Sequence, residues 1–363
     1  MRIVFVLSGL GAGGAEKIVN LLAHHRSLCD DDVHVIAVNA KSTQSYFPYD
    51  ASIHVEVLGP PQSGPDLGTT LHKLLKLRRR LKAISPHLVV SFLTKVNVLV
   101  GLATIGLGTT TIMSERNNFI LQKMHPFWHL IASVTARSAA TLVMQTNHAR
   151  SVLPTHLKPR AVVIPNPVSL PETPARSPTK GIRFVAVGRL DKQKGFDLLL
   201  AAFSQIARQV PNATLVIFGE GSERASLERQ ARELGIGDRI QMPGVTNCPG
   251  DWLSAGDVFV LSSRFEGFPN VLLEALMAGM ATVAFDCPWG PGEILRGEDA
   301  SLLVPAANVS LFADALMRVA TDQGLRQKLA ASGPRIAARY AKPIVFAQWD
   351  EVIISAVRNR AAS

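Results

Sequence analysis

Residues 165–187 read PNPVSLPETPARSPTKGIRFVAV, and this stretch decides how the chain is organised. Five prolines fall within residues 165–181. Because proline fixes φ and lacks a backbone N–H, no regular helix or strand is expected there. An apolar run with the character of a β-strand follows at once. We therefore predict a linker over residues 166–181 between two domains, 1–165 and 182–342. A C-terminal helix over 343–363 is expected to pack back across the domains.

Short apolar runs alternate with helical patterns on both sides of this linker. Strands are predicted at Arg2–Leu7, Val33–Val38, Leu88–Phe92, Thr109–Met113, Thr141–Met144, Ala161–Ile164, Arg183–Val187, Thr214–Phe218, Ile240–Met242, Val258–Leu261, Ala281–Phe285 and Leu302–Leu303. Helices are predicted at Glu16–Arg26, Leu71–Ile84, Asp197–Gln209, Glu223–Leu234, Val271–Ala278 and Ser310–Thr321. Alternation of this kind is typical of parallel sheets covered by helices on both faces. The fold class is therefore α/β, with two doubly wound domains whose ligand-binding edges would face one another across a cleft.

The composition fits a globular protein of two domains. The chain has 363 residues, 47% of them hydrophobic, and a single core rarely grows to that size. Its three cysteines, Cys29, Cys248 and Cys287, are scattered, which argues against a disulfide framework or a zinc site and indicates a reducing compartment. The first apolar run is too short for a signal peptide. The longest weakly polar run, 96–113, contains three Gly and four Thr, which argues against a membrane span.

The formal charge of +10 is unevenly distributed. Residues 1–165 hold 17 Lys and Arg against 8 Asp and Glu, and residues 166–363 hold 21 against 20. Much of the excess lies in HKLLKLRRRLK, residues 72–82, which reads as a basic amphipathic helix. Such a helix either rests on anionic lipid headgroups or forms the solvated face of a domain, and the sequence leaves both readings open. Nucleic-acid binding ranks lower, because no aromatic residues interleave with the basic ones.

Two glycine-containing loops follow predicted strands. GLGAGGAE, residues 9–16, precedes a helix whose N-terminal N–H groups can receive an anion. Its spacing departs from the dinucleotide-binding pattern, and the next predicted strand ends in Asn39 where that pattern wants an acid. A tight structural turn is the alternative. GRLDKQKG, residues 188–195, offers a guanidinium fork and two ammonium groups, which suit a diphosphate, although a solvated basic turn remains possible.

Two more loops carry acids. In FGEGS, residues 218–222, glycines flank Glu220 and would let a flat nucleobase lie against the backbone, and a plain turn explains this loop equally well. RFEGFPNVLLEALMAG, residues 264–279, places Glu266 in a loop and Glu274 in the first turn or so of a helix that Asn270 could cap. Carboxylates accept hydrogen bonds from sugar hydroxyls. The simpler reading is a surface Glu266 and a Glu274 that complements the helix dipole.

The acidic triplet Asp30–Asp32 is a possible metal site by residue type. It precedes the second predicted strand, at the sheet edge opposite the predicted cleft. We expect a solvated turn there, so that a positive charge on Arg189 and Lys194, rather than a metal ion, would offset the charge of a leaving group.

The order of these motifs, ending in Leu302-Leu-Val-Pro305, resembles glycosyltransferase family 4 over nearly the whole chain. The resemblance implies a GT-B fold of two Rossmann-like domains and a retaining, metal-independent enzyme without cofactor that uses a nucleotide sugar. SFLT (91–94), SERN (114–117) and FDCP (285–288) look like enzymes that extend polyprenyl-diphosphate-linked oligosaccharides in bacterial exopolysaccharide, O-antigen or N-glycan synthesis. UDP is favoured over GDP by resemblance alone, and the sugar, linkage and oligomeric state stay open.

The same resemblance implies roles for individual residues. Arg189 and Lys194 would bind the donor diphosphate, Glu266 the sugar hydroxyls and Glu274 the ribose hydroxyls. The remaining donor-side residues would approach through their backbone or line the pocket: Gly13, Gly14, Gly188, Gly219, Glu220, Gly267, Phe268, Pro269 and Asn270. Glu115, Arg116 and Asn117 would lie on the acceptor side.

The implied partners are a nucleotide-sugar donor, a lipid-linked glycan acceptor and an anionic membrane surface. No nucleic acid is expected. A cytoplasmic enzyme at the inner face of the cytoplasmic membrane would fit these partners. A GT-B sugar-nucleotide epimerase, a phosphorylase and a non-enzymatic nucleotide-binding protein at the membrane are the alternatives.

Overall fold

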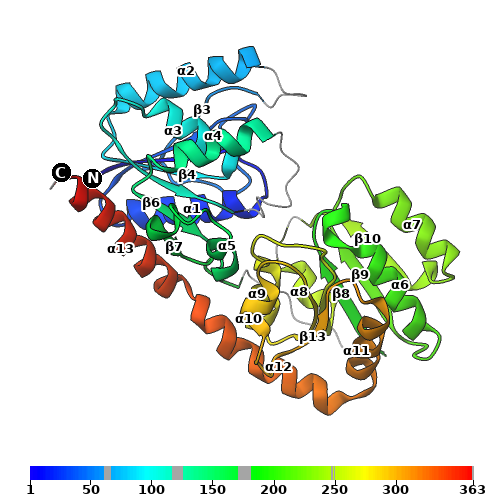
Figure 1. The fold of residues 1–363 in the computed structure, drawn as a ribbon. Coiled ribbons are helices and arrows are strands. Elements are labelled where there is room, and N and C mark those ends of the chain that lie inside the picture. Colours follow the sequence, from blue (N-terminus) through cyan, green and yellow to red (C-terminus); the bar gives the residue numbers. More distant parts are fainter. Residues whose placement is uncertain (61–66, 117–125, 171–180, 247, 249, 362–363) are drawn as a thin grey trace. The chain divides into compact units, whose positions relative to one another are not determined.

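The computed structural model describes residues 1–60, 67–116, 126–170, 181–246, 248 and 250–361 (Figure 1). The chain divides into two compact units. One comprises Met1–Pro167 together with Pro343–Ser363, and the other comprises Val168–Lys342. Residues 171–180 of the predicted linker lie outside the described residues.

The first unit is built on a seven-stranded parallel sheet in the order β3-β2-β1-β4-β5-β6-β7. Its strands are β1 (Arg2–Leu7), β2 (Asp32–Ala37), β3 (His54–Val57), β4 (Leu88–Phe92), β5 (Thr110–Ser114), β6 (Thr141–Met144) and β7 (Ala161–Val163). Its helices are α1 (Gly14–Ser27), α2 (Leu67–Ile84), α3 (Thr94–Ala103), α4 (Pro126–Ala136), α5 (Asn147–Ser151), the short 3₁₀ helix η1 (Lys158–Arg160) and α13 (Lys342–Ala361).

Both faces of this sheet are buried. Because side chains alternate along a strand, Phe5 of β1 packs with α1 and α13, and Val6 packs with α2 and α3 on the other face. Trp349 of α13 is fully buried in the first of these cores, and Asp350 accepts a hydrogen bond from Arg26 of α1 at 2.6 Å. The last helix of the chain thus completes the core of the first unit.

The second unit contains a six-stranded parallel sheet in the order β10-β9-β8-β11-β12-β13. Its strands are β8 (Arg183–Val187), β9 (Thr214–Phe218), β10 (Ile240–Gly244), β11 (Val258–Leu261), β12 (Ala281–Asp286) and β13 (Ser301–Pro305). Its helices are η2 (Lys192–Lys194), α6 (Phe196–Ala207), α7 (Arg224–Glu233), η3 (Gly237–Arg239), α8 (Asp251–Ala255), α9 (Asn270–Met277), α10 (Pro291–Leu295), α11 (Val309–Thr321), α12 (Gln323–Ala337) and η4 (Ala338–Tyr340). Helices α6, α7 and α11 cover one face and α8, α9 and α10 the other, and α12 contributes residues to both cores.

The α/β class and the doubly wound architecture predicted from the sequence are confirmed. Each predicted strand is present, with bounds that agree with the predicted ones to within two residues. Several elements were not predicted: strand β3, the short helices α5, α8 and α10, and the longer helices α4 and α12. β3 is a four-residue edge strand with a polar face, and the pattern of α12 is weakened by Gly324, Gly333 and Pro334.

The basic segment of residues 72–82 forms part of α2, but several of its cations are used inside the unit. Lys73 is buried and donates to Asn39 Oδ1 and to the carbonyl of Pro60. Arg78 donates to the carbonyl of Ile105, and Arg80 forms a bidentate pair with Glu56. The outward face of α2 is therefore less basic than its sequence suggested.

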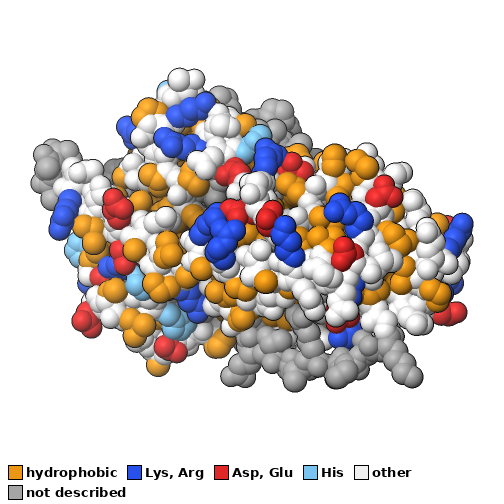
Figure 2. Space-filling model, turned by 90° about the horizontal axis from the view of Figure 1, so that it is seen from below, with side chains coloured by type: hydrophobic (Ala, Val, Ile, Leu, Met, Phe, Trp, Pro, Cys, Tyr) orange, Lys and Arg blue, Asp and Glu red, His pale blue; other side chains and the backbone are white. Residues whose placement is uncertain are grey.

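On the face of the molecule shown in Figure 2, Lys and Arg side chains are interspersed with acidic and hydrophobic ones.

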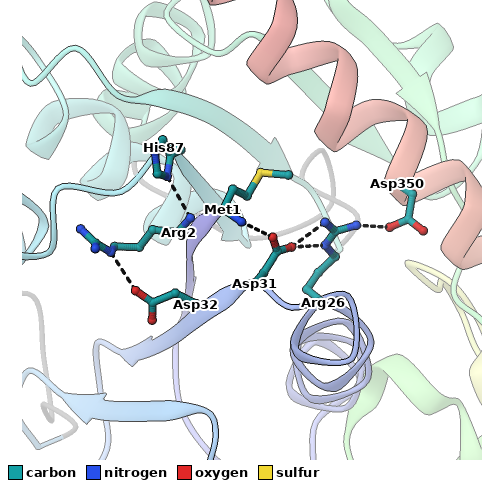
Figure 3. A network of polar contacts seen from close by, with 7 residues as sticks. All are labelled: Met1, Arg2, Arg26, Asp31, Asp32, His87 and Asp350. Atoms are coloured by element: carbon teal, nitrogen blue, oxygen red, sulfur yellow. Dashed lines mark hydrogen bonds and ion pairs between the residues drawn. The ribbon is translucent and has the colours of Figure 1, made fainter.

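Asp30 lies in an exposed turn, as predicted for the acidic triplet, but its two neighbours are paired. Asp31 is nearly inaccessible and pairs with Arg26 and with the amino group of Met1 (Figure 3). Asp32 begins β2 and accepts a hydrogen bond from Arg2 Nε at 2.8 Å. Asp31 thereby joins the amino end of the sheet to α1, and Asp32 joins β2 to β1.

None of the helices in the described residues has the length and apolar character required to cross a membrane.

Candidate functional site

The loop after β8 is shaped by two glycines. A Cβ at Gly188 would lie 3.0 Å from the stem of Lys194, so the lysine side chain runs directly over this glycine. Gly195 has a φ of 62°, and a Cβ there would lie 2.2 Å from the carbonyl oxygen of Ser262. This close approach joins the loop after β8 to the loop after β11, the neighbouring strand in the sheet.

The joined loops bring Lys194 and Glu266 into direct contact. Lys194 Nζ lies 2.8 Å from Glu266 Oε1, and Ser263 Oγ donates to the same oxygen at 2.5 Å. Glu266 is only 4% exposed. A carboxylate so buried is stable when it is charge-paired and hydrogen-bonded, and here both conditions hold. Burial and the negative charge of Glu266 also raise the pKa of the nearby Cys287 thiol, which is therefore neutral.

Arg189 lies in the same loop, but its side chain is 74% exposed. Its Nη2 lies 3.4 Å from Asp191 Oδ2 and 3.4 Å from Gln193 Oε1. Gln193 in turn donates to the carbonyl of Phe265 at 3.1 Å, which ties the β8 loop to the segment that carries Glu266. Of these two cations, Lys194 is held in a buried pair and Arg189 is open to a ligand.

The loop after β9 packs against the loop after β8. Gly219 has a φ of 139°, and a Cβ there would lie 1.9 Å from the carbonyl oxygen of Gly188. The backbone N–H of Leu190 donates to the carbonyl of Glu220 at 2.9 Å. The carboxylate of Glu220 pairs with Arg224 on the exposed side, away from Glu266. Gly188, Gly219 and Glu220 thus belong to the same edge as Lys194, with Glu220 at its periphery.

The second predicted acid, Glu274, is 8% exposed and belongs to α9. That helix begins at Asn270, and the N-cap position is Pro269, so the prediction that Asn270 caps the helix is wrong. Glu274 consequently lies in the second turn rather than the first. Phe268 is buried and packs near Tyr340, with ring centroids 5.9 Å apart. Gly267 is half-buried, directly beside Glu266.

The loop after β12 also contacts the segment that carries Glu266. The backbone N–H of Glu266 donates to the carbonyl of Pro288 at 3.1 Å. Gly290 has a φ of 104°, and a Cβ there would lie 2.5 Å from the ring of Pro269. The contacts of Ser263 and Pro288 were not predicted from the sequence. Ser263 lies two residues after a predicted strand, and Pro288 ends the FDCP motif. Their partners depend on strand order, which the motifs do not reveal.

In the first unit, the glycine-rich loop ends at α1, with Gly13 at the N-cap and Gly14 as the first helical residue. A Cβ at Gly13 would lie 2.1 Å from Glu16 Oε2, so the carboxylate of Glu16 covers this glycine. Burial raises the pKa of Glu16. The helix N-terminus expected to receive an anion therefore carries the protein's own carboxylate in this structure.

Arg116 is nearly completely buried, at 6% exposure. Its guanidinium carbon lies 5.5 Å from the ring of Phe92 and 5.4 Å from that of Trp349, and Nη1 donates to Asn166 Oδ1 at 2.6 Å. Within the described residues its Nε and Nη2 have no hydrogen-bond partner. Burial lowers the pKa of Arg116. Asn117, predicted beside it, lies outside the described residues.

A cavity of about 270 Å³ opens at the carboxyl ends of β5 and β6. Its wall is mostly apolar and includes Met113, Met144 and Ala136. Glu115, predicted on the acceptor side, contributes to the wall and accepts a hydrogen bond from Thr94 at 2.6 Å. The first unit thus has an apolar cavity with one carboxylate in its wall.

Two family models match consecutive parts of the chain. The model described as Glycosyltransferase Family 4 matches residues 12–171, and the one described as Glycosyl transferases group 1 matches residues 173–335. The chain belongs to glycosyltransferase family 4. The loops after β8, β9 and β11 lie within the second of these ranges.

Curated relatives of this glycosyltransferase are diverse. The Campylobacter jejuni N-acetylgalactosamine-N,N'-diacetylbacillosaminyl-diphospho-undecaprenol 4-alpha-N-acetylgalactosaminyltransferase is 28% identical, over 89% of this chain and 91% of the relative. The lipopolysaccharide core biosynthesis glycosyltransferase LpsD of Rhizobium meliloti is 36% identical over 44% of this chain and 45% of its own. This chain spans only 21% to 61% of the length of five of the matching relatives.

Solved structures match the whole glycosyltransferase chain. Sucrose-phosphate synthase from Thermosynechococcus elongatus has a TM-score of 0.84 at 18% identity, with 100% of both chains covered. HepE from Anabaena in complex with UDP-glucose has a TM-score of 0.78 at 18% identity, covering 98% of this chain and 100% of that one. Likenesses at this identity show the fold, which is GT-B.

Proposed function

We propose that this glycosyltransferase moves a hexosyl or N-acetylhexosaminyl group, with retention, from a UDP-sugar to a lipid-linked saccharide in bacterial surface polysaccharide or glycan synthesis. The observation that carries the proposal is the pair of Lys194 and Glu266, assembled beside the exposed Arg189 at the carboxyl edge of the second sheet. The printed names of the Campylobacter relative and of the HepE complex support the choice of acceptor and of nucleotide.

In the proposed donor site the cations bind the diphosphate, and the carboxylates bind hydroxyl groups. Arg189 and Lys194 bind the diphosphate and stabilise the charge that grows on the leaving nucleotide. Glu266 accepts hydrogen bonds from sugar hydroxyls, and Glu274 accepts them from the ribose. The backbone N–H groups of Gly267–Asn270 contact the sugar or phosphate. The phosphate oxygen that leaves the sugar takes the proton of the attacking hydroxyl.

The contact between Lys194 and Glu266 gives the free enzyme a neutral, preorganised pair. When a diphosphate arrives, Lys194 gains a second anionic partner, and Glu266 retains the hydrogen bond from Ser263. The reaction is expected to need no metal ion or cofactor, because these cations offset the developing charge. Full transfer activity in the presence of EDTA is the corresponding expectation.

The acceptor is proposed to bind the first unit near Glu115 and Arg116. The apolar cavity beside Glu115 supports this placement, since it can take an apolar part of a lipid-linked substrate. Arg116 is buried in this structure, so contact with an acceptor diphosphate would require the guanidinium to become accessible. An unchanged acceptor KM in an Arg116→Ala variant would show that Arg116 does not bind the acceptor.

A peripheral contact with the inner face of the cytoplasmic membrane is proposed through α2. Leu71 and Leu75 are 56% and 57% exposed, and Arg79 and Lys82 are exposed on the same helix. Exposed leucines beside lysine and arginine suit an anionic lipid surface. A Leu71→Ser/Leu75→Ser variant should float less with liposomes that contain anionic lipid. Equal flotation of variant and wild type would remove α2 from the proposal.

A transfer assay with labelled donors tests the proposed function. Nucleotide sugars are first screened for thermal stabilisation of the protein, and those that stabilise it are offered with a polyprenyl-diphosphate-linked saccharide. We expect a UDP-sugar to raise Tm and its sugar to appear in the lipid fraction. Stabilisation without transfer to any saccharide would support a nucleotide-binding protein, and absorption by pyridoxal phosphate would support a phosphorylase.

A further inference from the structure

Strands β2 and β3 place three metal-ligating side chains together at the amino end of the first sheet. Asp32 and His34 are two residues apart on β2 and therefore project from the same face. His54 begins β3 and is paired with His34 in the register of the two strands. Residues directly opposite one another in neighbouring strands lie on the same face, so the topology alone gathers these three side chains.

The ligand atoms of the three residues converge. His34 Nε2 lies 3.1 Å and His54 Nε2 lies 3.9 Å from the same oxygen, Asp32 Oδ1. The three ligand atoms lie within 4.8 Å of one another, and the two imidazole rings have centroids 4.7 Å apart. Ligands of a tetrahedral zinc ion at the usual bond lengths are about 3.3 Å apart. Small side-chain rotations therefore suffice to close the three atoms around one ion.

We propose that Asp32, His34 and His54 bind a divalent transition-metal ion, with Zn²⁺ as the expected occupant and water completing the coordination. Two imidazoles and one carboxylate suit zinc and its neighbours, whereas Mg²⁺ and Ca²⁺ prefer sets made of oxygen alone. Among the groups of His, Cys, Asp and Glu in the described part of the chain, this is the one whose atoms converge in this way.

The surroundings leave the site accessible. The side chains of His54 and Asp32 are 61% and 43% exposed, so an ion can enter from solvent. Arg2 binds Asp32 through Oδ2, the other carboxylate oxygen (Figure 3). This leaves Oδ1 to face the two histidines. Arg2 thereby holds the carboxylate in the orientation that the site requires.

The same surroundings predict that the site binds its metal ion with moderate affinity. The negative charges of Asp32 and Glu56 are balanced by their partners Arg2 and Arg80, so coordination rather than a strong local field would hold the ion. His34 Nδ1 is buried without a partner among the described residues. The outer hydrogen bond that normally orients a metal-bound imidazole is therefore missing.

The site lies at the amino edge of the first sheet, whereas ligands of such sheets bind at the carboxyl edge. Its effect would be to join β2 to the edge strand β3, which has a single neighbour in the sheet. The inference does not depend on the proposed transfer reaction, and its test uses binding rather than activity.

The test is a titration of the full-length, metal-free chain, with any purification tag removed, in a Cys29→Ser background that eliminates the exposed thiol. Co²⁺ is added first, because it reports its coordination by visible absorption, and Zn²⁺ is then used to displace it. We expect saturable binding of one Co²⁺ per chain, displaced by Zn²⁺. The His54→Ala variant should bind at least about ten-fold more weakly, since even outer-sphere changes weaken sites by ten- to a hundred-fold.

His72→Ala, which removes an exposed histidine of α2 outside the cluster, is the matched control and should bind as the parent does. Because His54 is exposed, its replacement should leave the fold intact, and Asp32→Asn provides a second variant. Ring-nitrogen NMR signals of His34 and His54 should shift on addition of Zn²⁺. Equal affinity in the parent and in both cluster variants, or no saturable binding by the parent, would overturn the proposal.

Discussion

The cations at the carboxyl edges of the two sheets differ in burial and in partner. Lys194 in the second unit pairs with a buried carboxylate and stands beside the exposed Arg189. Arg116 in the first unit lies between two aromatic rings with an amide as its hydrogen-bond partner. The two edges share one topology but offer different chemistry. The second edge presents charges for a polar ligand, whereas the first has a packed cation beside an apolar cavity.

The largest effect is expected from loss of the carboxylate in the second unit. Glu266→Gln should lower turnover by about a hundred- to a thousand-fold, the range seen when one preorganised polar group is removed from an active site. The change removes the charge that faces Lys194 and replaces one of the two acceptor oxygens proposed for sugar hydroxyls by an NH₂ donor. Steady-state kinetics with the donor that emerges from the screen measures it. Glu228→Gln, on the exposed side of α7, is the control. Equal turnover in the two variants would contradict the proposed role of Glu266.

Arg116 tests whether the first edge is held by packing or by charge. Arg116→Ala should lower the free energy of unfolding by about 2–3 kcal/mol, because it leaves a gap between Phe92 and Trp349. Arg116→Met should recover most of this loss, since a buried charge is costly and an apolar side chain of similar length fills the gap. Urea denaturation measures both variants. A Met variant as unstable as the Ala variant would show that the guanidinium itself stabilises the edge.

The cavity in the first unit gives a smaller, selective effect. Ala136→Phe should fill part of it and raise the acceptor KM by about ten-fold, with the donor KM unchanged. Val134→Phe is the matched control on the same helix, because Val134 is 56% exposed. A change in the donor KM, or an equal effect of the two substitutions, would place the acceptor elsewhere.

The smallest effect concerns the ion pair that anchors the Glu266 segment. Arg264 donates hydrogen bonds to Asp197 from Nη1 and Nη2, each at 2.7 Å. These bonds hold the pKa of the Asp197 carboxyl below its usual 3.8, despite partial burial. A depressed folded-state pKa contributes stability above pH 3.8 and loses it as pH falls through the folded value.

Asp197→Asn should therefore cost less than about 1 kcal/mol at neutral pH, because both partners are one-third exposed. The difference from wild type should shrink as the pH is lowered below 3.8. Thermal unfolding across this pH range measures it. A difference that stays constant with pH would mean that the ionised carboxylate is not the source of the stabilisation.

The elements of both edges were predictable from the sequence, because each is a local pattern. A strand, a glycine and a basic loop before a helix identified Arg189 and Lys194, and the turn before α9 identified Glu266. Which loops meet depends on strand order. β8 and β11 are neighbours although Lys194 and Glu266 are 72 residues apart, and no motif encodes that pairing.

Three other features were not predictable: the burial of Arg116, the N-cap of α9 and the metal-ligating cluster. The burial of Arg116 requires Trp349, which α13 brings back to the first sheet after the whole second unit. The cap predicted at Asn270 failed because Pro269 already occupies the N-cap position. The metal-ligating cluster was missed because His54 lies on an edge strand too short to be recognised from its pattern.

The most direct test of the account is the single-turnover rate of sugar transfer in Lys194→Ala compared with Lys192→Ala. Both lysines belong to the same short helix, but Lys192 pairs with Glu223 on the exposed side, whereas Lys194 pairs with Glu266. We predict a loss of about a hundred- to a thousand-fold for Lys194→Ala alone, with circular dichroism unchanged in both variants. Wild-type rates in a correctly folded Lys194→Ala variant would contradict the claim that this lysine stabilises the leaving nucleotide.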